Sequence, residues 1–465
     1  MSLEARAPSV CPGSKKGSAN QILDRRGLRV FRSNADDGRQ EVAKYEVAII
    51  GLGYVGLPLC LAFARAGVSV LGVDTDPGKP DALNAGQSYI KHIDSAAVQD
   101  AVAAEKLTAT TDFSHLQDAE AILICVPTPL TVNRVPDLTY VEKTATLLAP
   151  HLRPGQLVVL ESTTYPGTTD EVVKKLLETG SQLQAGKDFF LAYSPEREDP
   201  GNPNSNFAKV PKVVGGLTET CLKRAKMLYS KIVAEVVPVS SCRIAEATKL
   251  MENIFRSVNI ALVNELKVIY SRMGIDVWEV IRAASTKPFG YMPFFPGPGL
   301  GGHCIPIDPF YLTWKALEYG HHTRLIELAG EINTAMPEYV VSRVIDALND
   351  TGKPVKGSRI LILGVAYKAD VDDDRESPSY AIMESLEGRG AIVTYNDPHV
   401  PEIRRGRTNH AVSGKTSVEV SDDVDVVVIC TAHREYLNHD FSKMRIPLVD
   451  CRDIVKQRPA LYYAA

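Results

Sequence analysis

Tyr45-Glu46-Val47-Ala48-Ile49-Ile50-Gly51-Leu52-Gly53-Tyr54-Val55-Gly56 joins a short apolar strand to three glycines with the spacing GxGxxG. A helical pattern over residues 57–66, a second apolar strand over residues 68–73 and the acidic residue Asp74 follow directly. The glycine spacing alone is a weak signal, but the order strand, glycines, helix, strand and acid is specific for dinucleotide binding. The alternative is a tight turn between strand and helix that binds no ligand.

Each glycine of this loop has its own expected role. Gly51 permits the tight turn, Gly53 lets a pyrophosphate approach the backbone, and Gly56 lets helix and strand pack closely. The helix then points its free N–H groups at the phosphates. Asp74 would bind the adenosine ribose hydroxyls and repel a 2′-phosphate, which favours NAD over NADP. The expected cofactor contacts in this region are Gly51, Gly53, Tyr54, Val55, Gly56, Asp74 and Lys79.

Further apolar segments alternate with helical ones along the next part of the chain, at residues 121–126, 157–161, 189–192 and 212–215. This alternation predicts an α/β fold with a doubly wound parallel sheet. The turns after three of these strands carry Thr128, Glu161 and Glu196. Because ligands bind beyond the carboxyl ends of strands in open α/β sheets, we expect these turns to share one crevice. Each turn alone is also consistent with a simple proline turn or a helix N-cap.

A long helical pattern covers residues 242–273. Lys249 and Asn253 are four residues apart, so they lie on one face and their donor groups point the same way. Two aligned donors suit an oxyanion, whereas the alternative is an ordinary solvated helix face. The helix also has enough apolar positions, such as Ile254, Val258 and Leu262, to pack against more than one neighbour. We therefore expect a homodimer or a higher homo-oligomer.

The loop Pro296-Gly297-Pro298-Gly299-Leu300-Gly301-Gly302-His303-Cys304-Ile305-Pro306-Ile307-Asp308-Pro309 is dense in glycine and proline. Such a loop lets atoms of another molecule approach the main chain closely. Cys304 stands in it with His303 beside it and the carboxylate of Asp308 a few residues on. This setting is typical of a nucleophile. The alternative is a small buried cysteine in a structural turn.

A second α/β unit follows a helical pattern over residues 309–349, which Gly320 interrupts, and a linker over residues 352–357. Its expected strands cover residues 359–364, 391–395, 426–430 and 448–449, and we expect it to end by Arg458. It lacks GxGxxG, but Lys368 and Arg375 follow its first strand and are suited to phosphates. A solvated acidic turn is the alternative. Two such units predict two nucleotides that face each other across a cleft.

Composition limits the class of protein. The 465 residues are 45% hydrophobic with a formal net charge of −4, which favours two or three packed domains and gives no support for a nucleic-acid or membrane-surface role. No apolar run approaches the roughly 20 residues that span a bilayer. The eight cysteines include no CxxC pair, which fits reduced thiols in a cytoplasmic enzyme better than disulfides or zinc.

These patterns divide the chain into four parts. We expect a disordered extension over residues 1–41, a dinucleotide-binding domain over 42–240, a central helical region with the cysteine loop over 241–350, and a second nucleotide-binding domain over 357–460. The extension contains several arginines, which are also typical of transit peptides. Its aspartates and its lack of the apolar core of a signal sequence argue against a targeting peptide. The expected fold is two Rossmann-like domains joined by a long helical connector.

Several motifs together resemble the nucleotide-sugar 6-dehydrogenases, the UDP-glucose/GDP-mannose dehydrogenase family. They are Gly51-Leu52-Gly53-Tyr54-Val55-Gly56-Leu57-Pro58, Ser194-Pro195-Glu196-Arg197, the segment from Lys249 to Asn253, Gly301-Gly302-His303-Cys304-Ile305-Pro306-Ile307-Asp308-Pro309 and Asp373-Asp374-Arg375-Glu376-Ser377-Pro378. The resemblance covers residues 45–460 and is greatest to the N-acetylhexosamine branch. It implies a four-electron, NAD-dependent oxidation of the C6 alcohol of a UDP-sugar, with UDP-N-acetyl-D-glucosamine as the expected substrate. The alternatives are UDP-N-acetylmannosamine or UDP-glucose as substrate, and a sensor that binds without turnover.

The resemblance also implies catalytic roles. Cys304 would attack the sugar aldehyde, Lys249 and Asn253 would stabilise the oxyanion, and Asp308 would move protons through an ordered water. Glu196 and Thr128 resemble residues that position or activate the hydrolytic water, and Thr128 would also contact the cofactor.

Substrate contacts follow from the same resemblance. Tyr367 and Lys368 would hold the UDP, Arg452 would reach the substrate, and Arg375 would contact NAD from across the cleft. Further expected substrate contacts are Glu196, Arg197, Lys249, Asn253, Gly299 and Gly301. The chain departs from the UDP-glucose enzymes after Glu196, where it lacks their Phe-Leu-x-Glu-Gly run, and this argues against glucose. An arginine that the partner subunit contributes in those enzymes has no counterpart over residues 286–296.

Overall fold

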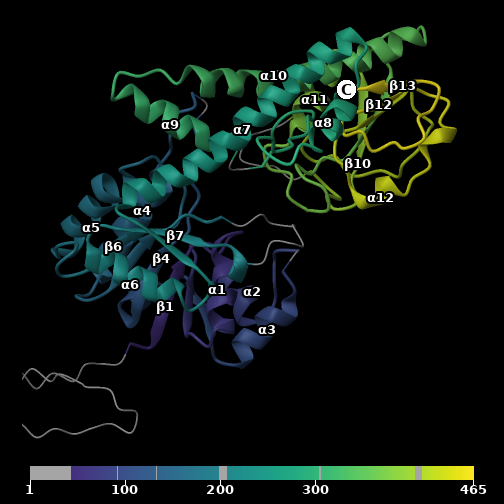
Figure 1. Ribbon diagram of the computed structural model, residues 1–465. Coiled ribbons are helices and arrows are strands. Elements are labelled where there is room, and N and C mark those ends of the chain that lie inside the picture. The colour runs from purple at the N-terminus through teal and green to yellow at the C-terminus, as the bar shows by residue number, and fades with distance from the viewer. Residues whose placement is uncertain (1–42, 92, 132, 198–206, 303–304, 404–410) are drawn as a thin grey trace, which may run out of the picture. The chain divides into compact units, whose positions relative to one another are not determined.

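The computed structural model describes residues 43–465 except 92, 132, 198–206, 303–304 and 404–410. The extension predicted over residues 1–41 lies outside the described residues, as do His303 and Cys304. Two β-sheets, each covered by helices, form the described part, and long helices connect them (Figure 1). The predicted α/β class with two Rossmann-type domains and a central helical region is therefore confirmed.

The first sheet has eight strands in the order β3-β2-β1-β4-β5-β6-β7-β8. The strands are β1 Tyr45–Ile50, β2 Val70–Val73, β3 Leu107–Thr110, β4 Ala119–Ile124, β5 Leu157–Leu160, β6 Phe190–Tyr193, β7 Lys212–Gly216 and β8 Val236–Val239. β7 runs antiparallel to β6, so the prediction of a wholly parallel sheet was wrong at this junction. A parallel neighbour needs a helical crossover. The described part of the β6–β7 connection contains only the short 3-10 helix Phe207–Lys209.

Alternate residues of the buried strands pack on opposite faces of this sheet. In β1, Val47 and Ile49 join the core under α1 and α6, while Ala48 and Ile50 join the core under α4 and α5. The helices here are α1 Gly56–Arg65, α2 Gly78–Asn84, α3 Ser95–Ala103, α4 Thr139–Leu148, α5 Lys174–Ser181 and α6 Glu219–Tyr229. Burial on both faces explains why the strands are continuous apolar runs.

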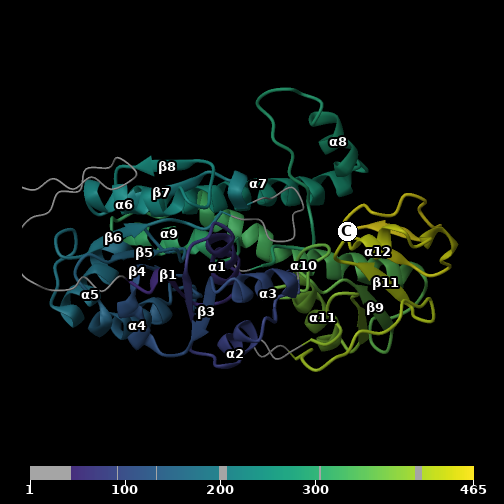
Figure 2. The same ribbon diagram turned by 90° about the horizontal axis from the view of Figure 1, so that it is seen from below.

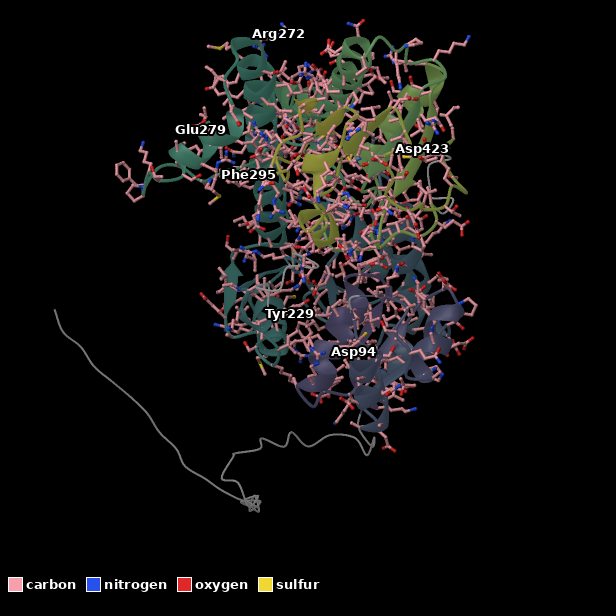
Figure 3. All side chains as sticks on the ribbon, turned by 90° about the vertical axis from the view of Figure 1, so that its right-hand side faces the viewer. Asp94, Tyr229, Arg272, Glu279, Phe295 and Asp423 are labelled. Atoms are coloured by element: carbon pink, nitrogen blue, oxygen red, sulfur yellow. The ribbon has the colours of Figure 1, made fainter. Side chains whose placement is uncertain are left out.

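The connecting region is built on α7, which covers Cys242–Met273 and begins at an N-cap in which Ser241 accepts a hydrogen bond from the N–H of Ile244. α7 packs along α10 Arg324–Asp350, and α9 Asp308–Leu317 contacts both. In Figure 3, Arg272 of α7 and Asp423 lie toward one end, while Tyr229 of α6 and Asp94 lie toward the other. α8 Val277–Ala284 and the loop after it project beyond the rest in Figure 2.

The second sheet has five parallel strands in the order β10-β9-β11-β12-β13. They are β9 Arg359–Leu363, β10 Ile392–Asn396, β11 Val426–Ile429, β12 Leu448–Asp450 and β13 Tyr462–Ala464, with α11 Pro378–Gly388 and α12 Arg434–Leu437. The domain does not end by Arg458 as predicted, because β13 adds an edge strand beyond that residue. Among the described helices, none is both long enough and apolar enough to cross a bilayer.

Candidate active site

A cavity of about 680 Å³ opens beyond the carboxyl ends of the central strands of the first sheet and reaches the segment after β9. This size suits a small ligand or cofactor. The predicted site residues that line it are Gly51, Gly53, Tyr54, Val55, Asp74, Lys79, Thr128, Glu196, Lys249, Asp308, Tyr367 and Arg375. Those that do not line it are Gly56, Arg197, Asn253, Gly299, Gly301, Lys368 and Arg452. Cys304 lies outside the described residues.

The glycine loop between β1 and α1 has the geometry expected of a phosphate-binding turn. Gly51 has a φ of 93°, and a Cβ there would lie 2.4 Å from the carbonyl oxygen of Cys125. A Cβ on Gly56 would lie 1.8 Å from the carbonyl oxygen of Gly51, so the helix packs against the turn. A Cβ on Gly53 would meet nothing within 4 Å. The open side of Gly53 therefore leaves room for a ligand at the amino end of α1.

Asp74 lies just after β2 and is buried. Its Oδ2 accepts a hydrogen bond from the Leu52 N–H at 2.8 Å. The same oxygen forms an ion pair with Lys79 Nζ, also at 2.8 Å. Its Oδ1 accepts the Asp76 N–H at 3.0 Å. A carboxylate has about four acceptor positions. These contacts hold Asp74 against the glycine loop and leave acceptor capacity toward the cavity for a ribose hydroxyl.

Arg375 reaches the same cavity from the loop after β9. Asp373 holds its guanidinium through two hydrogen bonds, of 2.8 Å from Nε and 2.5 Å from Nη2. The guanidinium also stacks on the ring of Tyr54, with 4.6 Å between its carbon and the ring centroid. Burial and the neighbouring acidic side chains raise the pKa of Tyr54 to about 12. A planar cation fixed in this way is oriented to bind a phosphate or a ribose oxygen.

Lys249, Asn253 and Asp308 form a buried cluster at the wall of the cavity. Asn253 Nδ2 donates to Asp308 Oδ2 at 2.5 Å, although α7 and α9 bring the two residues from positions 55 apart in the sequence. Burial raises the pKa of Asp308 to about 7, although Lys249 and Asn253 oppose the shift. A carboxyl group with a pKa near the working pH can both accept and release a proton.

The described part of the glycine and proline loop is packed between the helices and the second domain. The Gly297 N–H donates to Asn264 Oδ1 at 3.0 Å, and Asn264 Nδ2 donates to Asn333 Oδ1 at 2.9 Å. A Cβ on Gly297 would lie 2.6 Å from the Arg452 guanidinium, and a Cβ on Gly301 would lie 2.7 Å from Tyr367. These glycines therefore let the loop approach two predicted substrate contacts.

Arg197 and Lys368 are not part of the cavity wall. Arg197 Nη2 pairs with Glu252 at 2.8 Å, and its Nη1 donates to the Pro211 carbonyl at 2.6 Å. These contacts tie the residues after β6 to α7, so they occupy much of the donor capacity of the guanidinium. Lys368 adjoins Tyr367 but is not part of the cavity wall.

A charged cluster lies beside Glu196, and its lysine, Lys212, was not among the predicted site residues. Lys212 Nζ lies 2.7 Å from Glu161 Oε2 and 3.3 Å from Glu196 Oε2, and both carboxylates line the cavity. The Tyr229 hydroxyl donates to the other oxygen of Glu161. One signal in the sequence could have indicated this cluster. Lys212 begins an apolar strand, and a lysine buried there needs a carboxylate as its counter-ion.

The comparisons agree with this geometry. The three domain models of the UDP-glucose/GDP-mannose dehydrogenase family match the chain in sequence order. The NAD binding domain matches residues 45–233, the central domain residues 243–335 and the UDP binding domain residues 361–457. The chain belongs to the UDP-glucose/GDP-mannose dehydrogenase family. It is therefore an NAD-dependent nucleotide-sugar dehydrogenase, as the motifs predicted.

Relatives within this family differ in the sugar that their names specify. The chain is 35% identical to UDP-N-acetyl-D-glucosamine 6-dehydrogenase of Pseudomonas aeruginosa over 86% of this chain and 93% of that one. It is 37% identical to UDP-N-acetyl-D-mannosamine dehydrogenase of Escherichia coli (strain K12) over 84% and 94%. The solved structure of UDP-D-ManNAc dehydrogenase from Pyrococcus horikoshii has a TM-score of 0.82 at 31% identity and covers 90% of this chain and 98% of that one.

The glycine loop fits the NAD that the family uses. The open face of Gly53, the tight contact at Gly56 and the oriented carboxylate of Asp74 are the features a dinucleotide requires. The predicted cofactor is confirmed by the match to the NAD binding domain of the family.

Proposed function

We propose that the protein oxidises the C6 alcohol of a UDP-N-acetylhexosamine to the carboxylate, with UDP-N-acetyl-D-glucosamine as its first candidate substrate. The observation that carries the proposal is a buried cluster in which Lys249 and Asp308 line the same cavity as the glycine loop, and Asn253 is hydrogen-bonded to Asp308. An ammonium, an amide and a carboxyl group next to a dinucleotide loop provide what oxidation of an alcohol needs. They supply two donors for a negative oxygen and one acceptor for its proton.

The proposed reaction has three stages. NAD, when bound, accepts the hydride in each of two oxidations. In the first oxidation the C6 alcohol also loses its hydroxyl proton and becomes an aldehyde. The thiolate of Cys304 then adds to the aldehyde carbon, and the thiohemiacetal carries the second hydride. Loss of that hydride and of the hydroxyl proton leaves a thioester, and water cleaves its C–S bond to give the carboxylate and the free thiol.

Lys249, Asn253 and Asp308 have complementary roles in this proposal. The donors of Lys249 and Asn253 stabilise the oxyanion that develops on the sugar oxygen. Asp308 accepts the proton of the C6 hydroxyl through a water and releases it between turnovers. Its pKa of about 7 supports this role, because the group exchanges protons readily near neutral pH.

Glu196 and Thr128 are proposed to position the water that cleaves the thioester. Both line the cavity, Thr128 after β4 and Glu196 after β6, the two strands that flank β5. The Glu196 carboxylate accepts the Arg197 N–H at 2.6 Å and lies 3.3 Å from Lys212 Nζ, and these two contacts fix its orientation at the cavity wall. Thr128 is buried in the turn after β4.

The UDP half of the substrate is assigned to the second domain. Tyr367 lines the cavity, and Arg452 lies against Gly297 of the glycine and proline loop. We propose that Tyr367, Lys368 and Arg452 hold the uridine diphosphate, and that Gly299 and Gly301 let it approach the loop. Arg375 is proposed to contact NAD, because it stacks on Tyr54 of the glycine loop.

We further propose that the enzyme is a homodimer formed through α7. Large apolar residues that are at least 44% exposed recur at spacings of seven and four along this helix: Ile244, Met251, Phe255, Leu262, Ile269 and Met273. A stripe with this period on a helix of 32 residues suits the same face of a second copy.

The choice of substrate is tested by assaying NADH formation on UDP-N-acetylglucosamine, UDP-N-acetylgalactosamine, UDP-N-acetylmannosamine and UDP-glucose. We expect the highest kcat/KM with UDP-N-acetylglucosamine and the lowest with UDP-glucose. A preference for UDP-N-acetylmannosamine would favour the second candidate, which the similarity to the Escherichia coli relative supports. Binding of these sugars with no NADH from any of them would indicate a sensor instead.

A further inference from the structure

Lys212 occupies a position created by the reversed strand of the first sheet. Because β7 runs antiparallel to β6, its amino end lies at the edge of the sheet where β1 to β6 present their carboxyl ends. The register pairs Ala192 with Gly216 and Tyr193 with Gly215. Continued along both chains, it sets Glu196 opposite Lys212, and their side chains meet at 3.3 Å.

The lysine is almost inaccessible, with 3% of its surface exposed. Burial alone would lower the pKa of Lys212, but Glu161 and Glu196 outweigh it and raise the pKa above its ordinary value. Lys212 is therefore a fixed cation. Glu161 is its closer partner at 2.7 Å and is itself held by the Tyr229 hydroxyl. Burying a charged lysine costs desolvation free energy, which its two carboxylate partners must offset. One of those partners, Glu196, is a predicted catalytic carboxylate.

We propose that Lys212 is a positioning residue that keeps Glu196 ionised and aimed at the water that cleaves the thioester, with Glu161 as the counter-ion that balances the lysine. The inference rests on the proposed dehydrogenase function. In the step concerned, Glu196 accepts a proton from water as the water oxygen bonds to the thioester carbonyl carbon. The C–S bond then breaks and the thiolate leaves with its electron pair.

Among the described residues, groups from four elements face Lys212. Glu161 follows β5, Glu196 follows β6, Tyr229 ends α6 and Cys125 follows β4. The Tyr229 ring lies 5.3 Å from Lys212 Nζ. Burial, together with the charge of Glu161, raises the pKa of the Cys125 thiol well above its ordinary value, so that group stays neutral. The three charged groups carry a net charge of −1, from two carboxylates and one ammonium.

The test uses the full-length enzyme with saturating NAD⁺ and its best UDP-sugar. Lys212→Met should lower kcat on the order of 10²-fold and lower KM with it, so that kcat/KM stays within about threefold, because only hydrolysis of the covalent thioester is slowed. NADH should appear as a rapid burst before a slow steady rate, and the acid-quenched protein should carry the mass of the thioester. The acidic limb of the kcat profile should move to higher pH, because Glu196 loses the cation that favours its charged form. Lys212→Arg should restore much of the rate.

Two further variants separate this role from a loss of folding. Glu161→Gln combined with Lys212→Gln keeps the net charge of −1 and should still show the burst. Lys315→Met is the matched control, because Lys315 is also buried and lies 3.1 Å from Glu171 and 2.7 Å from Glu318, but is not part of the cavity wall. It should lower Tm without a burst or a shift of the pH profile.

The outcomes distinguish the inference from the function beneath it. A wild-type kcat and pH profile in Lys212→Met, or in the double variant if the single one does not fold, would overturn the role of Lys212. A reduced rate with no burst, no adduct and no shift would do the same. Absence of NADH from the wild-type enzyme with every UDP-sugar would instead overturn the proposed function.

Discussion

Burial sets the ionisation of Asp308, with 2% of its surface exposed and a pKa raised to about 7. Between pH 4 and pH 7 the native protein therefore keeps a proton that the unfolded chain has released. The unfolded state binds fewer protons in this range, so the contribution of Asp308 to stability falls as pH rises. In the proposed reaction this carboxyl group accepts and releases a proton.

Asp308→Asn removes this titration. Relative to wild type, the variant should gain stability from pH 4 to pH 8 by roughly 2–4 kcal/mol, because only the wild type has to ionise a buried carboxyl group. Chemical denaturation at several pH values measures the difference.

Asp276→Asn is the control of opposite sign. Although partial burial opposes it, hydrogen bonds from Arg458 and the Trp278 N–H hold the pKa of Asp276 below its usual range. Loss of the Asp276 carboxylate should lower the free energy of unfolding at neutral pH. The difference from wild type should shrink as pH falls. A constant difference between Asp308→Asn and wild type would contradict the assignment.

Cys304→Ser tests the nucleophile. A serine hydroxyl is a far weaker nucleophile than a thiolate at neutral pH, so the variant should lose on the order of 10²-fold or more of its NADH formation. Its NAD⁺ affinity should stay at the wild-type value, which a titration of bound cofactor measures. Full activity would show that oxidation to the carboxylate does not pass through the sulfur.

At the scale of elements, the glycine loop offers a matched pair of substitutions. Gly56→Ala would drive a Cβ to 1.8 Å from the Gly51 carbonyl, so we expect a loss of about 1–3 kcal/mol or more in unfolding free energy. Gly53→Ala meets no neighbouring atom and should leave Tm unchanged, but its methyl group occupies the expected path of the pyrophosphate.

Calorimetric titration with NAD⁺ measures the cofactor affinity of the two glycine variants, and thermal melts measure their stability. We expect a weaker NAD⁺ affinity in Gly53→Ala at unchanged stability. Wild-type affinity in Gly53→Ala would contradict the cofactor site, and wild-type stability in Gly56→Ala would contradict the close contact between helix and turn.

The elements differ in how far the sequence predicts them. The glycine loop and α7 were predicted because their signals are local and periodic. The reversal of β7 was not, because strand direction depends on the connection that precedes it, and nothing in residues 212–216 encodes it. β13 was missed since an edge strand of three residues is too short to show a period. Lys212 and Glu161 were missed as a pair, because their contact exists only once β7 is reversed.

At the scale of the whole molecule, the site draws on both domains and on the helices between them. Asn253 and Asp308 meet from α7 and α9, and Arg375 stacks on Tyr54 from the other domain. Contacts of this kind form only in the tertiary structure. The sequence could therefore indicate each of these residues as a site candidate, but it could not show that they lie close together. The resemblance to a known family grouped them. In the structure most of the described ones line one cavity, whereas Arg197, Lys368 and Arg452 do not.

The proposed dimer makes a prediction at this scale. Leu262→Glu combined with Ile269→Glu places two charges in the exposed apolar stripe of α7, which should shift a dimer to monomers because buried unpaired carboxylates are costly. Sedimentation analysis measures the change. Lys223→Glu on exposed α6 is the control and should leave the mass unchanged. A wild-type protein that sediments as a monomer at micromolar concentration would contradict the proposal.

The number of NADH molecules formed per UDP-sugar consumed decides whether the enzyme carries out the proposed four-electron oxidation. The wild-type enzyme, supplied with limiting UDP-N-acetylglucosamine and excess NAD⁺, should form two NADH for each sugar converted, and the product should be the uronate. One NADH per sugar with release of an aldehyde would contradict the four-electron oxidation on which the account depends.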